Sequence, residues 1–122
     1  MTGRLASFMV GFVFVGVVSC AALSTDRPGC INGHPRPRAP NVHYAGLARC
    51  PYYERDHIVP LCLLGADTLD NLQYQPIINA HLKDAREKAT CEAYCRGEID
   101  LITAQMQFHR EFPAMTPSNC FK

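Results

Sequence analysis

Charged residues are absent from the first part of this chain. Residues 5–25 contain no Asp, Glu, Lys or Arg, and the run is mostly apolar. A core helix fits this run poorly, because such a helix keeps a polar face toward water. Arg4 supplies a positive start and small residues occupy positions 19–22, which is the layout of a secretory signal peptide. We therefore expect residues 1–20 to be a leader and the protein to be exported.

The end of this leader allows two further interpretations. The string Val17-Val18-Ser19-Cys20 resembles the lipobox of lipoprotein signals, in which the Cys becomes the lipid-bearing first residue of the mature protein. A run of about 20 apolar residues also suffices to span a bilayer as an uncleaved anchor. The predicted location is therefore secreted, periplasmic or membrane-anchored, and lipidation of Cys20 is left open.

The sequence has no Cys-x-x-Cys pair, which weakens the case for a zinc site. Without Cys20, six cysteines remain in a mature chain of about 100 residues, which is small enough to need cross-links. These are Cys30, Cys50, Cys62, Cys91, Cys95 and Cys120. An even set in an exported small domain predicts up to three disulfides, and the sequence does not choose among the possible pairings.

Residues 21–50 are rich in Pro, Gly and Arg and show neither helical nor strand periodicity, so we expect an irregular arm. Residues 51–122 are expected to form an α+β domain, with a hairpin-plus-helix core followed by a second helix. The predicted strands and helices are residues 57–63, 71–75, 79–96 and 101–111. Pro60 makes the first strand an edge strand or breaks it, and Asp100 should cap the second helix.

The first predicted helix carries apolar residues at spacings of three and four. They are Leu82, Ala85, Ala89 and Ala93. This spacing predicts a single buried stripe along the helix.

Polar residues gather at the ends of the predicted hairpin and at the start of that helix. In order, they stand in Asp56-His57-Ile58-Val59-Pro60-Leu61, Gly65, Asn71-Leu72-Gln73 and Asn79-Ala80-His81-Leu82-Lys83-Asp84. This ordered set resembles the HNH endonuclease family over roughly residues 51–112. The resemblance implies a ββα-metal fold, in which a hairpin and one helix clasp a single divalent ion.

Phosphodiester hydrolysis needs an activated water and neutralisation of charge on the phosphate, tasks suited to a neutral imidazole and a divalent ion. By the resemblance, Asp56 binds the metal, His57 is the general base and Asn71 pins the loop that orients His57. Asp56 and His57 are adjacent in a strand, so they should point to opposite sides.

The helical part of the motif departs from the family pattern. Many relatives have a metal-binding His or Asn nine residues after the second-strand Asn, where this chain has Ala80. Its neighbours Asn79 and His81 are both candidate ligands. Lys83 stands at the Lys position of the family, and Lys83 and Arg55 are candidates for phosphate contact. The predicted ion is Mg²⁺, Mn²⁺ or Zn²⁺, since carboxylate, amide and imidazole ligands suit all three.

The resemblance thus predicts a metal-dependent endonuclease whose substrate is DNA, or nucleic acid generally. Five Arg against Glu54 alone between residues 27 and 55 agree with contact to phosphates. Membrane contact is expected only through the leader or a lipid on Cys20, and no protein partner is predicted. The alternative is an inactive, disulfide-stapled binding protein, exported or a lipoprotein, on the same scaffold; Ala80 and a net charge of +1 favour it.

Overall fold

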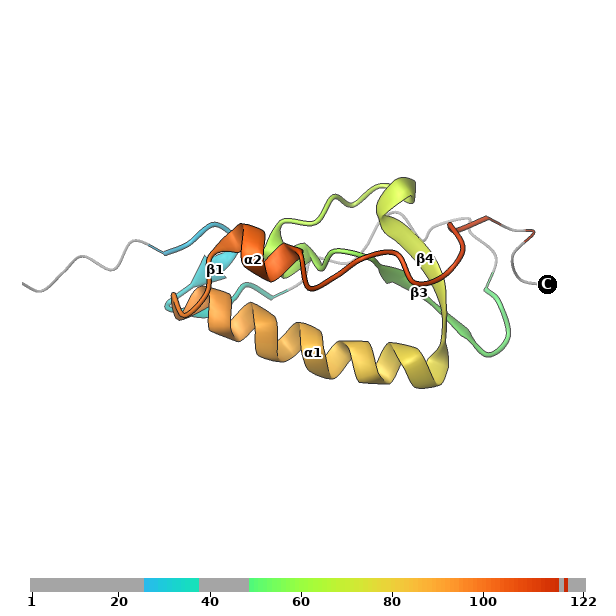
Figure 1. The fold of residues 1–122 in the computed structure, drawn as a ribbon, viewed down its shortest axis with the longest axis horizontal. Helices are drawn as coiled ribbons and strands as arrows, with labels where there is room; N and C mark the ends of the chain where they lie inside the picture. Colours follow the sequence, from blue (N-terminus) through green and yellow to red (C-terminus); the bar gives the residue numbers. More distant parts are fainter. Residues whose placement is uncertain (1–25, 38–48, 117, 119–122) are drawn as a thin grey trace, which may run out of the picture.

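A computed structural model describes residues 26–37, 49–116 and 118 of the chain. The predicted leader and the predicted lipidation of Cys20 lie outside these residues. The elements are β1 (Cys30–Ile31), β2 (His34–Pro35), β3 (Tyr53–His57), η2 (Leu61–Leu63), η3 (Leu69–Asn71), β4 (Leu72–Pro76), α1 (Ile77–Cys95) and α2 (Leu101–Gln105). The predicted α+β class is confirmed, with two antiparallel pairs of strands and two helices (Figure 1).

The central hairpin joins β3 and β4 antiparallel, with His57 opposite Leu72 and Tyr53 opposite Pro76. Helix α1 follows β4 directly and runs beside the hairpin (Figure 1). The predicted strand at residues 57–63 is wrong, because β3 ends at His57 and residues 61–63 form a 3-10 turn. Pro60 has no N–H to extend the ladder, so the chain leaves the sheet near it.

The predicted helix at residues 79–96 is confirmed as α1, and Gly97 follows it with a left-handed φ of +79°. Its predicted buried face is wrong, since Leu82 is 67% exposed and Ala85 and Ala89 are also exposed. The buried side instead carries Ala80, Lys83, Glu87, Thr90, Cys91, Tyr94 and Cys95. Polar partners on the hairpin and disulfides set this orientation, and they outweigh the gain from burying one leucine and two alanines.

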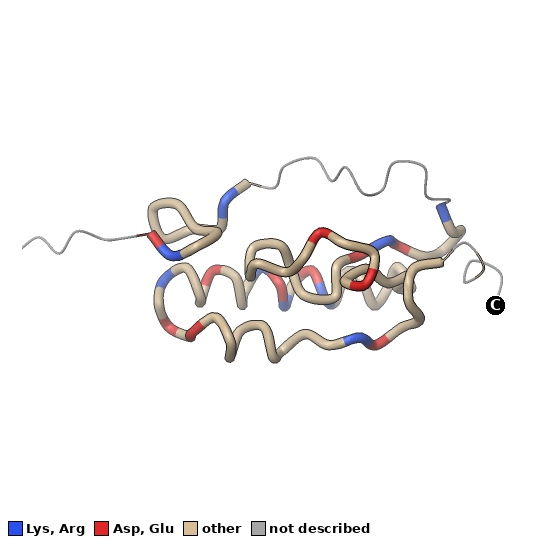
Figure 2. Tube along the Cα trace, turned by 90° about the horizontal axis from the view of Figure 1, so that it is seen from above, with Lys and Arg blue, Asp and Glu red and all other residues tan. Residues whose placement is uncertain are grey.

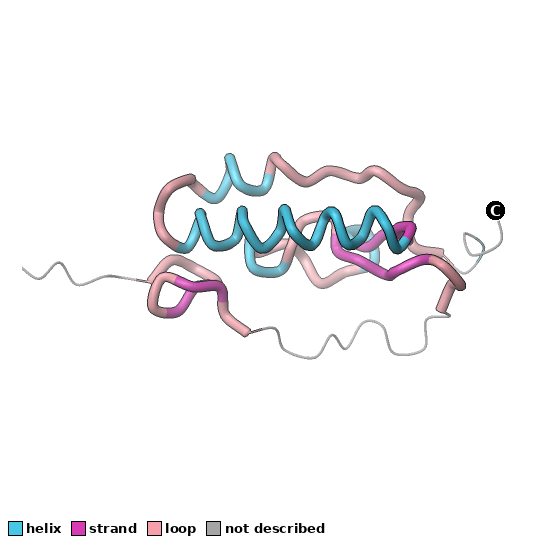
Figure 3. Tube along the Cα trace, turned by 90° about the horizontal axis from the view of Figure 1, so that it is seen from below, coloured by secondary structure: helices cyan, strands magenta, loops and turns pink. Residues whose placement is uncertain are grey.

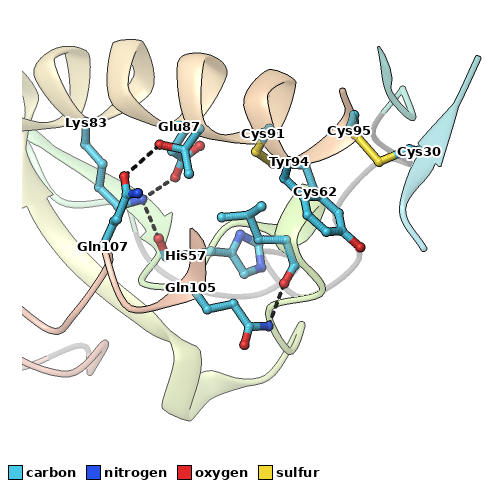
Figure 4. Close-up of a disulfide and its surroundings, with 12 residues drawn as sticks. Cys30, His57, Cys62, Lys83, Glu87, Cys91, Tyr94, Cys95, Gln105 and Gln107 are labelled. Atoms are coloured by element: carbon cyan, nitrogen blue, oxygen red, sulfur yellow. Dashed lines mark hydrogen bonds and ion pairs between the residues drawn. A yellow bond between two sulfur atoms is a disulfide. The ribbon is translucent and has the colours of Figure 1, made fainter. Parts of the chain in front are cut away.

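Two disulfides tie other segments to the C-terminal half of α1 (Figure 4). Cys95 is bonded to Cys30 in β1, and Cys91 is bonded to Cys62 in η2. Cys50 is also disulfide-bonded. The prediction of disulfides is therefore confirmed. Several disulfides are typical of a domain that is too small to form a large hydrophobic core.

The segment predicted as an irregular arm contains structure that the sequence pattern did not indicate. Residues 30–35 form the β1–β2 hairpin, and Cys30 is fully buried in a core with Leu63, Tyr94 and Phe108. In Figure 3 this hairpin lies beside one end of α1, on the side opposite α2. Pairing with Cys95 and burial, rather than strand propensity, therefore fix this part of the arm.

The second helix begins as predicted but is shorter. Asp100 caps it, since Asp100 Oδ1 accepts a hydrogen bond from Thr103 N at 2.9 Å. Helix α2 ends at Gln105, and the chain continues in extended form to a bridge between Ala114 and Gln73. The Gln73 side-chain oxygen accepts from the N–H groups of residues 111 and 112, so these donors bind a neighbouring strand in place of helical carbonyls. In the part of the chain described, no helix has the length and apolar character needed to cross a bilayer.

Candidate functional site

The imidazole of His57 lies at the end of β3 and is almost completely buried, with 1% of the residue exposed. Its Nε2 lies 2.8 Å from Oδ1 of Asp67, whose side chain is about one-third exposed. Asp67 therefore both orients the imidazole and separates it from water on this side. No sequence signal singles out Asp67, because it stands in a loop segment two residues after Gly65, where an acid is common.

Asn71 closes the loop that carries Asp67. Its Oδ1 accepts from Val59 N at 3.0 Å, and its Nδ2 donates to Val59 O at 3.0 Å and to Ala66 O at 2.7 Å. Gly65 is pressed against the same segment, where an added Cβ would lie 1.9 Å from Val59 O. The amide thus clasps both sides of the loop at the position where the resemblance expects a loop-pinning Asn.

Replacing this amide should loosen the loop measurably. We expect Asn71→Ala to lower the free energy of unfolding by about 2 kcal/mol, because it leaves backbone groups of Val59 and Ala66 without their partners. Urea denaturation followed by circular dichroism measures the loss. Asn79→Ala is the matched control, since Asn79 is exposed on the first turn of α1; equal losses in the two variants would contradict the clamp.

Lys83 reaches from α1 into the end of the hairpin (Figure 4). Its Nζ donates to Asp56 Oδ2 at 2.7 Å and to His57 O at 2.6 Å, and it also contacts the carboxylate of Glu87. An ammonium has three N–H donors, so all three are used. Lys83, Asp56 and Glu87 are buried, at 2%, 8% and 4% exposed. A single cation therefore balances two buried acids and holds β3 to α1.

The predicted metal ligands are not brought together in this arrangement. Asp56 is bound to the Lys83 ammonium, Asn79 and His81 are exposed on α1, and Ala80 occupies the buried position between them. Among residues 26–37, 49–116 and 118, no group of three or more His, Cys, Asp or Glu is placed to hold a metal ion. As these side chains lie, they do not fit a divalent ion, and metal binding stays a prediction.

Further acids lie around Asp56. Burial raises the pKa of the Glu54 carboxyl, and the nearby Asp84, Asp56 and Glu87 carboxylates raise it further, while His81 acts in the opposite direction. Glu54 therefore takes up a proton at a higher pH than a free glutamate does. This side of the hairpin is thus a region of negative potential with Lys83 as its buried counter-charge.

The strand facing these acids carries two fully buried glutamines. Gln73 pairs with Asp56 and Gln75 with Glu54 in the ladder, and both glutamines are 0% exposed. Within the described residues, Gln73 Nε2 and both polar atoms of the Gln75 amide have no hydrogen-bond partner. Directly opposite residues share a face of the sheet, so this face of the hairpin is polar where a small domain normally places apolar side chains.

Comparisons with known proteins add no relative. No protein-family model matches the chain, and neither the curated proteins nor the solved structures contain a match.

Proposed function

We propose that this protein hydrolyses phosphodiester bonds in nucleic acid, as an endonuclease of the HNH type. The observation that carries the proposal is the pairing of His57 with Asp67, on a loop clasped by Asn71 at the end of a β-hairpin that leads into a helix. Asp56 and His57 have different partners there, Lys83 and Asp67 respectively. The two side chains are therefore able to serve different tasks.

In this proposal His57 is the general base. The imidazole takes a proton from a water molecule, the resulting hydroxide attacks phosphorus, and the bond from phosphorus to the leaving oxygen breaks as that oxygen gains a proton from solvent. Asp67 accepts a hydrogen bond from the ring and stabilises the imidazolium that forms, as a carboxylate does for catalytic histidines elsewhere. Asp67 thus has a positioning role in this reaction.

Access to His57 requires movement of Asp67. The imidazole is 1% exposed, whereas the Asp67 side chain that covers Nε2 is about one-third exposed. A shift of Asp67 and its loop that keeps the hydrogen bond to Nε2 would open the other ring nitrogen, Nδ1, to water while the Asn71 clamp keeps the ends of the loop in place. Catalytic geometry is often completed only in the substrate complex.

Lys83 holds this site in place from α1. It donates to the backbone oxygen of His57 and neutralises Asp56, so it fixes the end of β3 against α1. Contact of Arg55 with a phosphate is part of the proposal, whereas the predicted phosphate contact of Lys83 does not fit, because its three donors are engaged and it is 2% exposed. Because the side chains around Asp56 do not fit a divalent ion as they lie, no step above passes through a metal, and metal dependence is left to measurement.

The test is nicking of supercoiled plasmid by the full exported protein with its disulfides intact. Parallel reactions contain Mg²⁺, Mn²⁺, Zn²⁺ or EDTA. We expect relaxed circles in at least one metal reaction; relaxed circles in EDTA as well would remove the metal from the proposal but keep the hydrolysis. The same four reactions are run on a labelled single-stranded oligonucleotide, and no cleavage of either substrate under any condition would contradict the proposed activity.

A second candidate is a binding protein that keeps this scaffold without catalysis. The burial of His57 and the neutralisation of Asp56 by Lys83 favour it. Nucleic-acid binding without nicking in any of the four reactions would identify it. For both candidates we propose an exported location, which the disulfides support because they persist in oxidising compartments.

A further inference from the structure

An exposed tyrosine occupies a strained position just before β3. The turn Cys50-Pro51-Tyr52-Tyr53 is closed by Tyr53 N–H donating to Cys50 O at 3.2 Å, and Tyr52 has a φ of +65°. Pro at the second position and a positive φ at the third are features of a type II turn, which favours Gly at that third position. Tyr52 is nevertheless 84% exposed, so burial in the domain does not explain its presence.

Beside this ring lies a hollow with the chemistry of a nucleotide site. Its volume is about 370 Å³, and Arg49, Tyr52, Tyr53, Glu54, Arg55 and Ile77 line it. Two guanidinium groups suit a phosphate, because each can donate two parallel hydrogen bonds to its oxygens. Two phenol rings suit the flat face of a base, and Glu54 can accept from base amino groups.

We propose that this hollow, here called the Tyr52 hollow, binds a nucleotide of single-stranded nucleic acid. The base stacks on Tyr52 and the phosphate lies between Arg49 and Arg55. Single-stranded nucleic acid is required, because in a duplex both faces of each internal base are covered by the neighbouring stacked base pairs. This inference rests on the proposed function and names its substrate class.

The position of the hollow agrees with such a substrate. Strand β3 runs from Tyr53 at the hollow to His57, four residues and about 13 Å away. A nucleic-acid strand held at Tyr52 and running along β3 would reach His57 at the other end of β3. Figure 2 shows positive and negative positions interspersed along the chain, so an aromatic anchor complements modest electrostatic attraction.

Apolar residues beside the Tyr52 hollow raise a second possible binding partner, a membrane surface. Ile77 is 42% and Ile78 76% exposed beside Tyr52, and together with the arginines they would also suit an anionic membrane surface. A nucleic acid is favoured because the arginines share a concave hollow with the two rings, whereas contact with a bilayer needs no hollow. Vesicles are therefore included in the test.

The experiment measures binding of a fluorescein-labelled 15-nucleotide oligo-dT, and of a duplex of that length, to the full protein in EDTA. Fluorescence anisotropy gives the dissociation constants. Tyr52→Gly suits the φ of the turn, so it removes the ring without disturbing the fold. We expect Tyr52→Gly to weaken single-strand binding about 10-fold, Tyr52→Phe to leave it unchanged and Arg49→Ala to weaken it and reduce its salt dependence.

The control is Arg86→Ala, which removes an exposed arginine of α1 outside the hollow. Unchanged binding by Tyr52→Gly, or duplex binding as tight as single-strand binding, would overturn the inference. Tyr52-dependent binding to phosphatidylserine vesicles with no binding to the oligonucleotide would overturn it in favour of a membrane contact. If the protein nicks DNA but does not bind the oligonucleotide through Tyr52, only this inference is refuted. If it binds the oligonucleotide through Tyr52 but does not nick DNA, only the proposed activity is refuted.

Discussion

His57→Ala is expected to lower kcat/KM for cleavage of a labelled oligonucleotide by about 10²- to 10⁴-fold, the range for loss of a general base. The substitution removes the imidazole and leaves the Asp67 carboxylate without the partner that it contacts at 2.8 Å. The measurement is the initial rate at several substrate concentrations, with circular dichroism to show that the variant is folded.

Two other variants test whether this loss of activity is specific to the His57 imidazole. Asp67→Asn keeps the shape of the side chain but removes the charge that would stabilise an imidazolium, so we expect a smaller loss than for His57→Ala. His109→Ala removes an exposed histidine beyond α2 and should retain full activity. Loss of activity in His109→Ala equal to that in His57→Ala would show that the effect is not specific to the proposed base.

Lys83→Met is expected to destabilise the fold by about 3–5 kcal/mol. The ammonium is a counter-charge of two buried acids, so its removal takes away the cation that Asp56 and Glu87 share. It also removes the donor to His57 O. Urea or thermal unfolding of the disulfide-intact protein measures the loss.

A double substitution separates the charge effect from lost packing. Lys83→Met combined with Glu87→Leu also removes one of the two acids that Lys83 binds, so we expect it to be more stable than Lys83→Met alone. Lys88→Met, on the exposed side of the same helix, should change stability by less than about 0.5 kcal/mol. If Lys83→Met behaved like Lys88→Met, the buried ion cluster would not contribute to the fold.

Local signals in the sequence were sufficient for several elements. Helix α1 was predicted to within two residues at each end, since Pro76 precedes it and Gly97 follows it. The Asp100 cap was likewise readable from the residue type and its position. Disulfides were predicted from the even number of cysteines in an exported small domain, although their pairing required the structure.

The orientation of α1 was not readable from local periodicity. Leu82, Ala85 and Ala89 recur at helical spacing, but the side that carries Lys83 and Glu87 is buried. Contacts between distant residues decide this, because Lys83 meets Asp56 across 27 positions of sequence and Cys91 is bonded to Cys62 across 29. A hydrophobic pattern cannot anticipate a buried ion cluster.

The candidate site was likewise predicted only in part. Asn71 was predicted to pin a loop, and it makes three hydrogen bonds across one. Asp56 and His57 were predicted to point to opposite sides of the strand, and their side chains contact different partners, Lys83 and Asp67. Asp67 was missed because a turn composition is compatible with an acid for many reasons. The ion pair between Lys83 and Asp56 was also missed, because the HNH pattern assigns the Asp56 carboxylate to a metal.

The most direct test of His57 as the base of a phosphodiester hydrolysis is plasmid nicking by the wild type and by His57→Ala, purified by the same route and compared in one reaction series. We expect the wild type to convert supercoiled plasmid to relaxed circles, and the folded His57→Ala variant to leave it supercoiled over the same period. Equal conversion by both proteins would contradict the role of His57, and cleavage by the wild type of neither the plasmid nor a single-stranded oligonucleotide would contradict the activity itself.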